Sequence, residues 1–111
     1  MDIAMPGKAF GAAAGIALLL VQALQPARAA ALDERQTALL RANCLQCHAR
    51  PGDRAPQIGD EQAWKARLRQ GEARMLVNVV QGLRGMPPLG YCSACSEQDL
   101  RALVRFVAGQ P

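Results

Sequence analysis

The sequence predicts a small all-α domain. Apolar residues recur at helical spacing in several segments, and no stretch shows the strict alternation that is typical of a half-buried strand. Glycine and proline separate these segments. The first 29 residues have the pattern of a removable segment, and the remaining 82 suffice for one domain of three to five helices.

The N-terminal segment resembles a targeting signal. Residues 9–24 are small or apolar except for Gln22, Lys8 precedes them, and the Ala27-Arg28-Ala29 end provides a small-residue cleavage pattern. These 16 residues fall short of the roughly 20 that span a bilayer, so an uncleaved anchor is the less favoured alternative. We predict a secretory signal over residues 1–29, cleaved after Ala29 or, as a second choice, Ala31, and a mature domain over residues 30–111. The simplest destination is a bacterial periplasm, an oxidising compartment in which disulfides form.

The first two helices follow from local signals. Residues 32–48 carry Leu39 and Leu40 and predict the first helix, and residues 50–59 are rich in proline and glycine and predict a loop. Asp60 has the character of an N-cap, so the second helix should begin at Glu61 and stop at Gly71.

Two more helices follow along the chain. Residues 72–81 show apolar spacing and precede Gly82, which predicts the third helix; residues 85–88 then form a loop. Ser96 and Asp99 make a capping box in its aspartate form, so the last helix should start there. The apolar residues assigned to its buried face are Leu100, Leu103, Val104 and Val107, and Phe106 is expected to pack in the core against the first helix.

The run Cys44-Leu45-Gln46-Cys47-His48 carries the chemistry. Two thiols three positions apart, followed at once by an imidazole, is the attachment pattern of a c-type haem. His48 is the only histidine of the chain and would be the proximal ligand of the iron. The alternatives are a zinc knuckle, a redox-active dithiol, and a coincidental pattern in a helix.

A sixth iron ligand could come from either of two methionines. Met75 falls within a helical pattern, where methionine usually fills the core, whereas Met86 precedes Pro87 and Pro88 in a loop. Because proline fixes φ, that backbone can present a thioether stiffly. Met86 is therefore the predicted ligand.

Five motifs in order resemble the short class I bacterial cytochromes c, most closely the cytochrome c5 branch. The resemblance extends from about Leu39 to Val107 and is specific in combination, because the methionine loop followed by Cys-x-x-Cys selects the branch. The motifs are Cys44-Leu45-Gln46-Cys47-His48, Ala55-Pro56-x-Ile58-Gly59-Asp60, Ala63-Trp64, Gly85-Met86-Pro87-Pro88 and Cys92-Ser93-Ala94-Cys95-Ser96.

The resemblance implies a cytochrome c fold around one covalent haem c, with His48 and Met86 as axial ligands of the iron. It also implies that the Pro56 carbonyl accepts a hydrogen bond from His48, which would orient the ring. For Trp64 it suggests an indole N–H that donates to a haem propionate, with plain core packing as the equal alternative.

The resemblance further implies a disulfide between Cys92 and Cys95. Four cysteines in an exported chain, two of them used by haem, leave one even pair, which favours a structural clip over a reversible dithiol. A zinc site made of all four cysteines is disfavoured, because 44 residues separate the pairs and the usual interval is about 15 to 20.

Charge and composition limit the partners. The mature chain has 11 basic and 8 acidic residues, a net charge of +3, and its basic residues are scattered. Nucleic-acid binding is therefore not expected, nor is a membrane span after signal cleavage. As the resemblance implies, the protein should be a soluble periplasmic carrier of one electron, docking transiently at the haem edge to donor and acceptor proteins that the sequence does not identify. It is not expected to be an enzyme; the alternative role is the small haem-bearing subunit of a periplasmic dehydrogenase or sulfur-oxidising enzyme.

Overall fold

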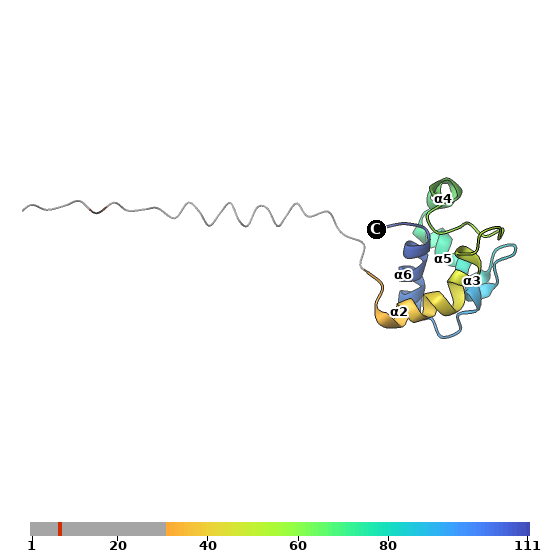
Figure 1. Ribbon diagram of the computed structural model, residues 1–111, viewed down its shortest axis with the longest axis horizontal. Coiled ribbons are helices and arrows are strands. Elements are labelled where there is room, and N and C mark those ends of the chain that lie inside the picture. Colours follow the sequence, from red (N-terminus) through yellow and green to blue (C-terminus); the bar gives the residue numbers. More distant parts are fainter. Residues whose placement is uncertain (1–6, 8–30) are drawn as a thin grey trace, which may run out of the picture.

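The computed structural model describes residue 7 and residues 31–111, so the predicted signal peptide, apart from residue 7, lies outside the described residues. The described residues form helices joined by loops, with a single isolated bridge between Leu83 and Met86 in place of any sheet (Figure 1). The all-α prediction is confirmed. Within the described part of the chain, every helix is too short or too polar to cross a bilayer.

The first predicted helix is a run of three segments rather than one uniform helix. It consists of α2 (Glu34–Leu39), the π-helical turn η2 (Leu40–Cys44) and α3 (Leu45–His48). Asp33 is the N-cap and forms a capping box with Gln36. The Asp33 side chain accepts a hydrogen bond from the Gln36 backbone N–H, and the Gln36 side chain accepts one from the Asp33 backbone N–H. The wider turn of η2 ends at Cys44, the first residue of the attachment motif, and π-helical turns are frequent at functional sites.

Helix α4 (Glu61–Leu68) begins where its cap predicts. The Asp60 side chain accepts a hydrogen bond from the Ala63 backbone N–H at 3.0 Å, which satisfies one of the free donors of the first turn. Trp64 is the one buried residue of α4 and lies on the side of the helix that faces the core. The chain then passes through Gly71 into α5 (Glu72–Gln81), which matches the predicted third helix.

The Met86 loop, residues 83–91, links α5 to the last helix. It ends in the 3-10 turn η3 (Pro88–Tyr91), and Cys92 follows. Helix α6 (Glu97–Val107) then begins at Ser96, where both halves of the capping box with Asp99 are present, as predicted. Figure 1 shows α6 in dark blue beside α2 and α5.

The core lies where these helices meet. One buried cluster joins residues of η2, α4, α5 and α6 and the end of the chain: Leu40, Trp64, Met75, Leu103, Val107 and Ala108. Leu100 is also buried, and Val104 is partly buried against the cluster, which supports the predicted inner face of α6.

Phe106 departs from its prediction. Its residue is 47% exposed, so the core assignment was wrong. At 100° per residue, Phe106 is rotated about 60° from Leu103, away from Val107. The inner face of α6 is occupied by smaller aliphatic side chains, and the phenyl ring lies at its margin.

Candidate haem-attachment site

The two thiols of the attachment motif lie one helical turn apart. Cys44 ends η2 and Cys47 is in α3, so both project from neighbouring positions on one side of the helix. Both are free thiols; Cys44 is partly buried and Cys47 is exposed. Burial raises the pKa of the Cys44 thiol.

His48 follows and is held by the next loop. Its Nδ1 atom lies 2.8 Å from the Pro56 carbonyl oxygen, to which the ring N–H at that position donates. The other ring nitrogen, Nε2, is then the one with a lone pair for a metal. A second bond at 2.8 Å, from the Ile58 backbone N–H to the His48 carbonyl, fastens the same loop to the end of α3.

Gln57 and Trp64 form further hydrogen bonds that hold this loop in place. The Gln57 side-chain amide donates to the Cys47 carbonyl at 2.9 Å, and the Gln57 carbonyl accepts from the Trp64 indole N–H at 2.9 Å. The indole and imidazole centroids are 5.9 Å apart. The indole N–H thus donates to Gln57 and the ring packs in the core, while the bond from Trp64 to a haem propionate stays a prediction.

The two methionines occupy different environments. Met75 is 5% exposed and belongs to the core cluster, as predicted for a core-filling side chain. Met86 is partly buried in the loop, where its backbone exchanges two 3.0 Å hydrogen bonds with Leu83. This bridge closes the tight turn that holds the thioether-bearing residue.

The loop is wound tightly on both sides of Met86. Three residues other than glycine have a positive φ here, namely Arg84, Leu89 and Tyr91. Such conformations persist only where surrounding contacts impose them. Tyr91 itself is 81% exposed.

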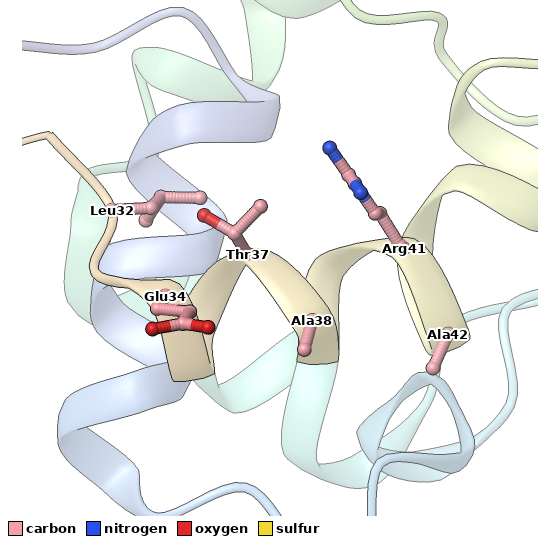
Figure 2. Close-up of a pocket in the computed structure, with 6 residues that line it drawn as sticks. All are labelled: Leu32, Glu34, Thr37, Ala38, Arg41 and Ala42. Atoms are coloured by element: carbon pink, nitrogen blue, oxygen red, sulfur yellow. The ribbon is translucent and has the colours of Figure 1, made fainter.

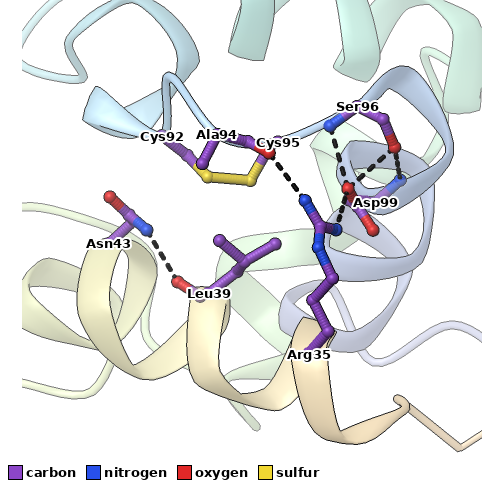
Figure 3. The surroundings of a disulfide bond; sticks show 8 residues. All are labelled: Arg35, Leu39, Asn43, Cys92, Ala94, Cys95, Ser96 and Asp99. Atoms are coloured by element: carbon purple, nitrogen blue, oxygen red, sulfur yellow. Dashed lines mark hydrogen bonds and ion pairs between the residues drawn. A yellow bond between two sulfur atoms is a disulfide. The ribbon is translucent and has the colours of Figure 1, made fainter.

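Cys92 and Cys95 are bonded to each other, with Cα atoms 5.4 Å apart (Figure 3). This small ring lies between the Met86 loop and α6, the position expected of a clip. The bond also removes two of the four thiols that the zinc alternative requires. Among the described residues, no three histidine, cysteine or acidic side chains gather as a metal site.

This donor set fits a haem. It offers two free thiols one turn apart, an imidazole whose Nδ1 is already paired with Pro56, and a soft thioether on a braced loop. The shallow pocket in Figure 2 is separate from these groups, because its lining comes from the outer side of the first helical run. Its residues are Leu32, Glu34, Thr37, Ala38, Arg41 and Ala42.

Comparison with known proteins agrees with this chemistry. Residues 31–107 match the family described as cytochrome C oxidase, cbb3-type, subunit III. The chain is 34% identical to cytochrome c5 of Ectopseudomonas mendocina over 73 residues, covering 64% of this chain and 84% of that protein. It is 37% identical to cytochrome c5 of Azotobacter vinelandii over 68 residues, covering 60% and 82%. The chain belongs to the class I c-type cytochromes.

A solved structure shares the fold of this cytochrome. It is the crystal structure of an electron transfer complex of nitrite reductase with cytochrome c, matched with a TM-score of 0.61 and 39% identity over 71% of this chain and 96% of that one. The cytochrome carries covalently attached haem c and acts in electron transfer, as its family does.

The sequence of this cytochrome did not predict the contacts of Arg35. It reaches from α2 to the first turn of α6 and to the disulfide ring. The sequence holds no signal for this contact, since 64 residues separate Arg35 from Asp99 and scattered arginines are usually solvated. The π-helical turn that ends at Cys44 was also not predicted, because no residue pattern distinguishes it from an ordinary helical turn.

Proposed function

We propose that the mature chain, residues 30–111, is a periplasmic one-electron carrier. In this proposal Cys44 and Cys47 form the two thioether bonds to haem c, and His48 and Met86 are the axial ligands of the iron. The observation that carries the proposal is the 2.8 Å bond between His48 Nδ1 and the Pro56 carbonyl, because it leaves Nε2 as the metal-binding nitrogen.

Each residue of the site has a distinct task. Haem supplies a one-electron couple between ferrous and ferric iron. His48 is kept in one orientation by Pro56, and its basicity is raised by the same hydrogen bond. Met86 offers a soft sulfur, which favours ferrous iron and hence a reduction potential on the positive side. The Leu83 bridge holds the backbone that carries this sulfur.

The proposed role is exchange of electrons with other redox proteins. The exposed Cys47 supports a haem attachment that is accessible from the surface, where a partner can approach. A net charge of +3 on the mature chain favours an acidic partner. The similarity to a cytochrome c solved with nitrite reductase supports a redox enzyme as the class of partner. Encounters between redox proteins bury less than about 1,200 Å² of surface. We assign no general acid, general base or nucleophile to the site.

The test compares two methionine variants. Met86→Ala should abolish the sulfur-to-iron charge-transfer band of the ferric protein and lower the reduction potential, because the loop has no other soft ligand. Met75→Leu is the matched control: it conserves apolar volume in the core and should cost less than about 1.5 kcal/mol of stability with an unchanged spectrum.

The same preparations test attachment and export. Their haem should resist acid-acetone extraction, and the intact mass should correspond to cleavage after Ala29 or Ala31 plus one haem. Loss of the sulfur band in Met75→Leu but not in Met86→Ala would overturn the ligand assignment. Haem that extracts from the unmodified protein would overturn covalent attachment.

A further inference from the structure

Arg35 connects three parts of the fold that are distant in sequence. From α2, its Nη1 atom donates to Asp99 Oδ2 at 2.5 Å, and its Nη2 atom donates to the Ala94 carbonyl at 2.8 Å (Figure 3). One planar guanidinium therefore contacts α6 and the disulfide ring at once. This two-pronged geometry is specific to arginine, because a lysine ammonium cannot reproduce the fork.

The acceptor in α6 is a buried carboxylate. Asp99 is 6% exposed, and its Oδ2 also accepts from the backbone N–H of Ser96 at 2.9 Å and from the Ser96 hydroxyl at 2.7 Å. Arg35 and then Ser96 hold the pKa of this carboxyl well below its usual range. A buried anion with fixed donors gives Arg35 a rigid anchor point, although the arginine side chain is itself half-exposed.

The other acceptor belongs to the segment that ends the Met86 loop. Ala94 lies inside the Cys92–Cys95 ring, and Cys92 is 2% exposed. The Cys92 N–H donates to the Leu89 carbonyl at 3.0 Å, and the Gly90 N–H donates to the Pro87 carbonyl at 2.9 Å. Backbone hydrogen bonds therefore connect the Cys92–Cys95 ring to the residues that follow Met86.

We propose that Arg35 is a positioning residue for Met86. The Leu83 bridge fixes the loop upstream of Met86, and the disulfide ring, held down by Arg35 on Ala94 and Asp99, fixes it downstream. Loss of Arg35 frees the downstream end, and the strained turns at Leu89 and Tyr91 can then relax and draw the thioether away. The proposal rests on Met86 being the axial ligand.

The test measures how easily Met86 is displaced. Imidazole added to the ferric holoprotein competes with Met86, so its apparent affinity increases with the fraction of molecules whose sulfur has left the iron. Arg35→Ala should bind imidazole about tenfold more tightly than the unmodified protein. Arg35→Lys, which keeps the charge but not the fork, should lie between the two.

Arg105→Ala is the matched control. Arg105 is also a half-exposed arginine that joins two helices, through a 2.7 Å ion pair with Glu72, but it does not contact the disulfide ring. Its variant should bind imidazole as the unmodified protein does. Equal affinity in Arg35→Ala, Arg105→Ala and the unmodified protein would overturn the proposal.

Two further readouts keep the outcome unambiguous. If Arg35→Ala does not accumulate as holoprotein, Arg35→Lys carries the test: tighter imidazole binding supports the proposal and unchanged binding overturns it. Met86→Ala separates this inference from the proposed function. If Met86→Ala retains the sulfur band, the ligand assignment itself has failed; if it loses the band while both Arg35 variants bind imidazole normally, only the role of Arg35 is wrong.

Discussion

Gly82 shows how a single residue constrains the Met86 loop. Its backbone has φ 80° and ψ 155°, a region that is essentially restricted to glycine. A Cβ atom there would lie 2.9 Å from both the Met86 carbonyl oxygen and the Pro88 nitrogen. Gly71, at the other end of α5, has nearly the same conformation, φ 85° and ψ 158°, but nothing lies within 4 Å of its Cβ position.

This pair allows backbone strain to be separated from collision. Gly71→Ala should lower the free energy of unfolding by about 1–3 kcal/mol through strain alone. Gly82→Ala should lose a further 1–3 kcal/mol, roughly the cost of overpacking, and should weaken the sulfur band because the Met86 carbonyl must move. Urea unfolding and the ferric spectrum of both variants provide the check. Equal stability losses with unchanged spectra would show that the loop tolerates the added methyl group.

Whether a residue's role could be predicted from the sequence depended on how far along the chain its partners lie. Cys44, Cys47 and His48 form one short motif, and Met86 stands out because prolines follow it, so the roles proposed for them rest on local sequence. The Pro56 contact was accessible only through family resemblance. The Arg35 fork was not, because it exists only after α2 and α6 have packed together.

Helix boundaries were predictable at the element scale because caps are local. The Asp60 and Ser96 side chains each accept a hydrogen bond from a backbone N–H three residues further on. The starts of α4 and α6 could therefore be predicted from the local sequence. The winding of η2 and the outward position of Phe106 did not follow, because both depend on how neighbouring helices pack.

The first turn of α6 should impart a pH dependence to folding. In the folded state, Arg35 and Ser96 lower the pKa of the Asp99 carboxyl. A lowered folded pKa contributes stability above the ordinary aspartate value of about 3.9, and that contribution is lost as pH falls toward the folded value. Asp99→Asn lacks the charge at every pH. The difference in unfolding free energy between the unmodified protein and Asp99→Asn should therefore be largest near neutrality and shrink below about pH 4.

Urea unfolding at pH 7, pH 4 and pH 2.5 measures this difference. Glu97→Gln, on the exposed side of the same turn, serves as a control for general charge effects on α6. A difference that stays constant over this range would mean that the carboxyl of Asp99 gains nothing from Arg35 and Ser96 on folding.

At the scale of the whole molecule, the protein core is small. Nine apolar residues are buried in the part of the chain that the structure describes, while Val77, Val80, Leu83 and Phe106 are each 40–47% exposed. Domains of this length bury a modest fraction of their surface and have little stability to spare. The haem c of this family adds a large apolar ring that is bonded to the chain, and we expect this ring to complete the core.

Folding should accordingly depend on attachment of the cofactor. The double variant Cys44→Ser with Cys47→Ser replaces none of the nine buried apolar residues, although Cys44 packs against their cluster, and it removes both proposed thioether bonds. The haem-free chain must then fold on those nine residues alone. We expect reduced helical circular dichroism and a broad, non-cooperative thermal transition. Met86→Ala is the control, because it removes the proposed sixth iron ligand while retaining the covalent haem, and it should still unfold in one cooperative step. A haem-free chain with full helicity and a sharp transition would show that the helical core is sufficient and that haem c is added to a fold already complete.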